Sequence, residues 1–101
     1  MVDIDYINKL LKCLYNNVHI PVFVIVGGAL PYELASLING STQTVMLVIN
    51  VDKASDSYIQ TLKLLAEKPL VPMILVSSPH HDGGSAMKAL RDRCMVFDLT
   101  K

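Results

Sequence analysis

The stretch that decides the fold is Val22-Phe23-Val24-Ile25-Val26, followed directly by Gly27-Gly28. It is a continuous apolar run rich in β-branched residues, which is typical of a central strand buried on both faces of a parallel sheet. The two glycines end the strand. Pro31 suits the first turn of a helix that begins after them, and Asn39-Gly40 closes that helix.

The same alternation of apolar strand and helix continues along the chain. Further strands are expected at 44–51, 73–76 and 95–99. Helices are expected over 3–16, from Ser55 or Asp56 onward, and through 86–90. In the helix that Ser55 or Asp56 caps, the residues expected to face inward are Ile59, Leu62, Leu65 and Ala66. In the helix after Pro31, the expected apolar face is Leu30, Leu34, Leu37 and Ile38.

This alternation predicts an α/β fold. We expect three layers, with a mostly parallel four-stranded sheet and helices on both faces, similar to a truncated P-loop or Rossmann-like sheet. Residues 1–101 fit one domain. The helix at 3–16 has no strand of its own, so it is expected to pack on one face of the sheet.

The composition limits the partners. The net charge is 0 and 51% of the residues are hydrophobic, so we expect no strong nucleic-acid binding and a protein partner or self-association. The acidic start, Met-Val-Asp-Ile-Asp, is unlike a signal peptide, and the apolar runs are too short for a membrane span. A cytoplasmic location without membrane contact is therefore expected. Cys13 and Cys94 form no metal or redox motif and are expected to be buried free thiols.

Ligands of open parallel sheets bind where the strands end, which here means three loops. The first, at Gly27-Gly28, lacks the Lys and Ser/Thr of a phosphate loop, and Glu33 places negative charge where phosphate would lie. The second holds Asn50 and Asp52, where Asp52 suits a cap or turn. Gly27, Gly28 and Asp52 are weak cofactor-binding candidates, and no cofactor is expected.

The third loop, 77–85, is the most polar part of the chain. His80, His81 and Asp82 are adjacent, so their side chains diverge, and no metal site is predicted. Ser77 or Ser78 with His80 or His81 is an alternative nucleophile and base, but the strained turn around such a nucleophile is missing. A surface loop in which His80 and His81 contact a partner is the favoured interpretation.

Five stretches, in order, resemble the nucleotide-binding core of AAA+ clamp-loader subunits, the delta and delta-prime type especially. They are Val22–Gly28, Val45–Ala54, Leu62–Pro69, Pro72–Ser78 and Ala89–Phe97, the last containing Leu-Arg-Asp-Arg-Cys. The resemblance implies that Arg93, with Arg91 beside it, reaches across a subunit boundary to a partner. It also implies that Ser77 or Ser78 stands at the sensor position of the third strand.

The chain departs from that family where the ATPase chemistry occurs. Ile49 and Asn50 stand in place of the Walker-B acids, Asp92 replaces a serine, and one strand–helix unit is missing. The resemblance therefore implies a subunit that is not an enzyme and has no catalytic residues. Such a subunit would bind a P-loop ATPase or clamp-loader component, as in DNA replication.

Two other functions remain open. One is a flavodoxin-like ligand-binding or enzymatic domain that uses the strand-end loops. The other is a homo-oligomeric scaffold that pairs through the edge at 95–99 or through the first helix. Strand order separates the first of these from the ATPase-like core. Numbered along the chain, the core predicts the order 4-1-3-2, whereas a flavodoxin-like sheet would have 2-1-3-4.

Overall fold

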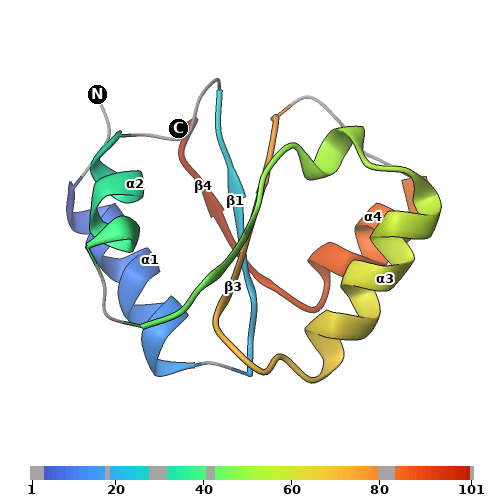
Figure 1. Ribbon diagram of the computed structural model, residues 1–101. Helices are drawn as coiled ribbons and strands as arrows, with labels where there is room; N and C mark the ends of the chain where they lie inside the picture. Colours follow the sequence, from blue (N-terminus) through green and yellow to red (C-terminus); the bar gives the residue numbers. More distant parts are fainter. Residues whose placement is uncertain (1–3, 18, 28–31, 41–42, 80–83, 101) are drawn as a thin grey trace.

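The computed structural model describes residues 4–17, 19–27, 32–40, 43–79 and 84–100 (Figure 1). The helices are α1 (Ile4–Asn16), α2 (Tyr32–Asn39), α3 (Asp56–Glu67) and α4 (Gly84–Arg91), with a short 3-10 helix η1 (Val51–Lys53). The strands are β1 (Val22–Ile25), β2 (Met46–Val48), β3 (Met73–Ser77) and β4 (Met95–Asp98).

The strands form one four-stranded sheet in the order β2-β3-β1-β4. Every neighbouring pair is parallel, with Val22 of β1 opposite both Ile74 of β3 and Met95 of β4. The predicted α/β fold is thus confirmed, and its sheet is parallel throughout. Read from β4, the order is the 4-1-3-2 expected for the ATPase-like core, and the flavodoxin-like order is not found.

Helices cover the sheet on both faces, with α1 and α2 on one side and α3 and α4 on the other (Figure 1). Each face has its own core. Val22, Val24, Ile74 and Val76 pack with Ile7, Leu10, Leu14 and Leu34 on the α1 and α2 side. Phe23, Met73 and Leu75 pack with Ile59, Leu62, Ala66 and Leu90 on the other side. Alternate residues of β1 and β3 therefore supply opposite cores, as the two-residue period of a strand requires. The first helix lies on one face of the sheet, as expected.

The strand expected at 44–51 is much shorter in the structure. Only Met46–Val48 form β2, because this strand lies at the edge and pairs on one side alone. Asn50 then adopts a left-handed conformation, φ 57° and ψ 40°, which turns the chain into η1. Val51, expected in the strand, is instead fully buried in η1.

The helix faces agree with the sequence prediction except at their borders. Ser55 caps α3, and its hydroxyl accepts a hydrogen bond from the Tyr58 amide at 3.2 Å. Leu65 was expected to face inward, but it is 43% exposed, and Leu37 on α2 is also exposed. Both predictions were wrong because these residues lie beside the buried stripe, where the sheet edge is too narrow to cover them. Leu30 lies outside the described residues.

Candidate functional site

The end of the sheet at which the strands finish brings two of the predicted loops together. Asp52 follows β2 and Ser78 follows β3, and these strands are neighbours. The Ser78 hydroxyl donates to Asp52 Oδ2 at 2.8 Å, and the Ser78 amide donates to Asp52 Oδ1 at 3.2 Å. Both carboxylate oxygens are therefore engaged by one residue of the adjacent strand end.

This contact sets the protonation of Asp52. Partial burial raises the pKa of its carboxyl, but the hydrogen bonds from the Ser78 hydroxyl and amide, with Lys53 nearby, lower it by more. The net effect is a pKa below the ordinary 3.8. Asp52 is thus a stable anion at neutral pH and does not have the raised pKa that suits a general acid.

The structure separates the two serines that the sequence left as alternatives. Ser77 is the last residue of β3 and is buried, and its hydroxyl donates to the Ser78 carbonyl at 3.2 Å. Ser78 is the one whose hydroxyl reaches a neighbouring strand. The prediction that Asp52 is a turn residue fits its place in η1, but its link to Ser78 was missed. Only the order of the strands could have revealed that link.

Gly27 is a further residue that the sequence predicted at a strand end. Gly27 follows β1, and a Cβ placed there would lie 3.8 Å from Thr100 Cγ2, an ordinary contact. Packing therefore does not demand glycine at this turn. Gly28, His80, His81 and Asp82 lie outside the described residues. Their predicted roles stay predictions.

Arg93 and Arg91 lie at the opposite end of the sheet. They belong to the end of α4 and the turn before β4, where the strands begin. Arg93 Nη2 forms an ion pair with Glu67 Oε1 at 3.0 Å, which ties this turn to the end of α3, and both side chains are partly exposed. The two arginines are therefore separate from the Asp52–Ser78 contact.

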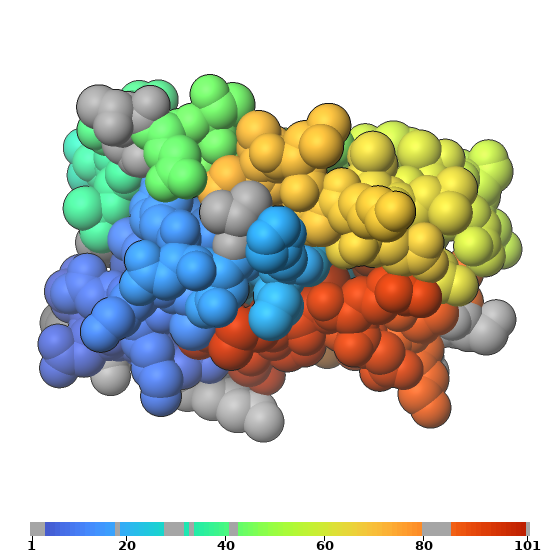
Figure 2. All heavy atoms as spheres, turned by 90° about the horizontal axis from the view of Figure 1, so that it is seen from below, coloured from blue at the N-terminus to red at the C-terminus, as the bar shows by residue number. Residues whose placement is uncertain are grey.

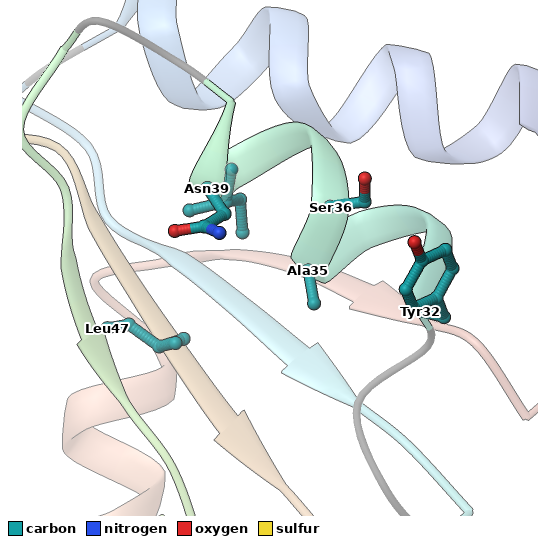
Figure 3. Close-up of a pocket in the computed structure, with 6 residues that line it drawn as sticks. Tyr32, Ala35, Ser36, Asn39 and Leu47 are labelled. Carbon is teal, nitrogen blue, oxygen red and sulfur yellow. The ribbon is translucent and has the colours of Figure 1, made fainter.

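Apolar grooves flank the outer edge of β2 on both faces of the sheet. Figure 3 shows the first groove, about 400 Å³, which is lined by Tyr32, Ala35, Ser36 and Asn39 of α2 and by Leu47 of β2. The second, about 460 Å³, lies between α3 and β2. It is lined by Met46, Leu64, Leu65, Lys68, Pro69, Leu70, Val71 and Met73. Leu70 is 95% exposed there, so a large apolar surface meets solvent.

Compared with protein-family models, curated proteins and solved structures, the chain matches none of them. Among the described residues, no group of three or more His, Cys, Asp or Glu side chains is arranged to hold a metal ion. The same residues include no helix long and apolar enough to cross a membrane.

Proposed function

We propose that this chain is a non-catalytic protein-interaction subunit with an ATPase-like core, which binds a P-loop ATPase assembly of the clamp-loader kind. The observation that carries the proposal is the strand order β2-β3-β1-β4. The resemblance required that order, and the competing flavodoxin-like arrangement required another. The two orders differ in where β2 lies, since here β2 pairs with β3, whereas a flavodoxin-like sheet pairs it with β1.

A non-catalytic role is supported by the residues at that end of the sheet. The turn after β1 has neither the lysine nor the hydroxyl residue with which a phosphate loop binds nucleotide and Mg²⁺. The one described carboxylate beside the ends of β2 and β3, Asp52, has both oxygens hydrogen-bonded to Ser78. A carboxylate held in this way serves to join two strand ends.

A protein partner is supported by the Arg93 guanidinium. It has five N–H donors, and the ion pair with Glu67 engages it through Nη2. The side chain stays partly exposed, so further donors can reach a carboxylate or phosphate on a neighbouring subunit. The ion pair with Glu67 leaves the guanidinium at the surface, where a partner can reach it.

The experiment is affinity purification with the full chain as bait in extract of the native host, followed by quantitative mass spectrometry. We expect a P-loop ATPase subunit to be enriched, and Arg93→Ala to lower its recovery about fivefold or more. Lys9→Ala, which removes a cation from α1 on the other face of the sheet, is the matched control and should leave recovery unchanged.

Glu67→Gln separates partner binding from fold stability. It breaks the ion pair but keeps the guanidinium, so recovery of the ATPase should be retained. Equal loss with Arg93→Ala and Glu67→Gln would show that the pair is merely structural. Enrichment of no P-loop ATPase by the wild type would overturn the proposal.

A further inference from the structure

The outer edge of β2 is an open template for another strand. The Met46 amide donates to the Pro72 carbonyl at 2.8 Å, so Met46 and Val48 direct their peptide groups toward β3. By alternation, Val45, Leu47 and Ile49 direct theirs outward. No described strand lies beyond them. We call this row, with its outward peptide groups, the β2 edge.

The opposite edge of the sheet is protected. The Met95 and Leu99 amides donate to carbonyls of the β1 segment, which leaves Val96 and Asp98 facing outward on β4. The Asp98 amide there donates to the Tyr6 hydroxyl of α1 at 3.1 Å. A charged residue and a side chain that caps a backbone donor are two ways in which proteins block strand addition. None of the three residues of the β2 edge is charged.

A strand added at the β2 edge must be apolar on both faces. On one face it would meet Leu47 and Ile49, which are 44% and 57% exposed, beside the α2 groove. On the other face it would meet Leu64, Leu65 and Leu70 of the α3 groove. β2 itself meets this demand, because Met46-Leu47-Val48-Ile49 is apolar at every position.

We propose that two copies of this chain pair through their β2 edges, antiparallel, to form one continuous sheet. A two-fold axis perpendicular to the sheet relates the copies, so the interface is self-complementary. The same operation places α2 beside α2 of the second copy and α3 beside α3. In Figure 2, viewed from the end at which the strands begin, β2 lies along the upper border between these two helices.

Exposed apolar side chains along α3 support this pairing. α3 packs over β2 and β3, since Ile59 and Leu62 share a core with Val48 and Met73. Two such helices would lie about two strand spacings apart, roughly 10 Å, which is the packing distance of helices. They would run antiparallel, so Tyr58 of one would face Leu65 of the other, and these side chains are 46% and 43% exposed in the single chain. Each dimer holds this pair twice.

The interface area that a stable dimer requires indicates that the two grooves beside β2 take part in the contact. A stable interface buries about 800 Å² on each partner, and an edge strand of three residues is only about 10 Å long. The exposed side chains on both sides of β2 must therefore be covered too. The stripe at helical spacing, Tyr58, Thr61, Leu65 and Lys68, supplies the contact along α3.

The first test is the mass of the purified full chain in solution, by light scattering and by sedimentation across a dilution series. We expect twice the monomer mass of 11.1 kDa. Ile49→Lys should weaken the dimer at least about 100-fold, because it places a charge on the edge. Val96→Lys puts the same charge on the β4 edge, at a residue that is 48% exposed, and should leave the dimer unchanged. Far-UV circular dichroism confirms that both variants fold.

The second test places charges at this helix contact. Tyr58→Lys and Leu65→Glu should each weaken the dimer about tenfold, and the two together in one chain should restore it in part, because each lysine then faces a glutamate of the second copy. A monomeric wild type would overturn the proposal and leave the β2 edge open to a strand of another protein. A dimer broken by Val96→Lys but not by Ile49→Lys would overturn it as well. Neither result depends on an ATPase partner, so this proposal and the proposed function fail separately.

Discussion

Asp52→Ala tests the link between the ends of β2 and β3. The substitution removes both acceptors of the Ser78 hydroxyl and amide, which lie 2.8 and 3.2 Å from the carboxylate. Hydrogen bonds to a charged group contribute about 1.5–3 kcal/mol each when buried, and solvent reduces that here because Asp52 is only half-buried. We expect the free energy of unfolding at about pH 7 to fall by about 1–2 kcal/mol. For a chain of this size that corresponds to a melting temperature lower by roughly 4–15 °C.

The pH dependence of the stability difference between wild type and Asp52→Ala is a more specific test than its size at neutral pH. The folded pKa of Asp52 lies below the ordinary 3.8, so its contribution to stability is complete above that value. The contribution is lost as the pH falls through the folded pKa, when the carboxylate becomes protonated. The difference between wild type and Asp52→Ala should therefore shrink as the pH is lowered below 3.8. Other carboxyl groups are common to both proteins and cancel in the difference.

Urea unfolding of four proteins measures the effect. Wild type, Asp52→Ala, Ser78→Ala and the double variant form a double-mutant cycle, and we expect a coupling energy of about 1 kcal/mol at about pH 7. Asp92→Ala, which removes an exposed carboxylate in the turn before β4, is the matched control for general charge effects. A coupling energy of zero, or a stability difference that persists unchanged at about pH 2.5, would refute the reasoning.

Three further predictions concern the fold. Phe23→Ala removes a ring that is 1% exposed in the α3-side core and should cost about 3–5 kcal/mol in chemical unfolding; a cost below about 1 kcal/mol would contradict this packing. Ser55→Ala should lower stability by about 1 kcal/mol through loss of the α3 cap, whereas Ser55→Asp should keep it. Burial raises the pKa of the Cys94 thiol to about 12, so at about pH 8 iodoacetamide should alkylate it over about 100-fold more slowly in the folded chain than in urea. Peptide mass spectrometry measures that ratio, and equal rates would contradict the burial.

The sequence predicted the interior of the fold better than its borders. The run at 22–26 has apolar side chains on both faces, and both faces can be buried only if the strand lies inside a sheet. Its central position therefore followed from composition. Leu65 and Leu47 could not be assigned in this way, because an apolar residue at the border of a stripe is covered only if a neighbour extends far enough. At the β2 edge no described strand does so.

The candidate site depended on contacts between distant segments. Asp52 and Ser78 were each recognised as strand-end residues, but their hydrogen bonds require β2 and β3 to be neighbours. Periodicity along the chain carries no information on that. The ion pair of Arg93 with Glu67 was missed for a related reason, since it joins the ends of two helices. The strand order was predicted from the resemblance, and no pattern within single elements would have supplied it.

The pairing of β1 with β4 has a consequence for how the chain reaches its folded state. β4 follows every other strand in the sequence, yet it borders β1, the first strand, with Val22 opposite Met95. Until β4 is synthesised and docks, one side of β1 lacks its backbone partners. Contacts between such distant segments slow folding. During synthesis β1 therefore has one unpaired edge until β4 has left the ribosome, and unpaired strand edges favour aggregation.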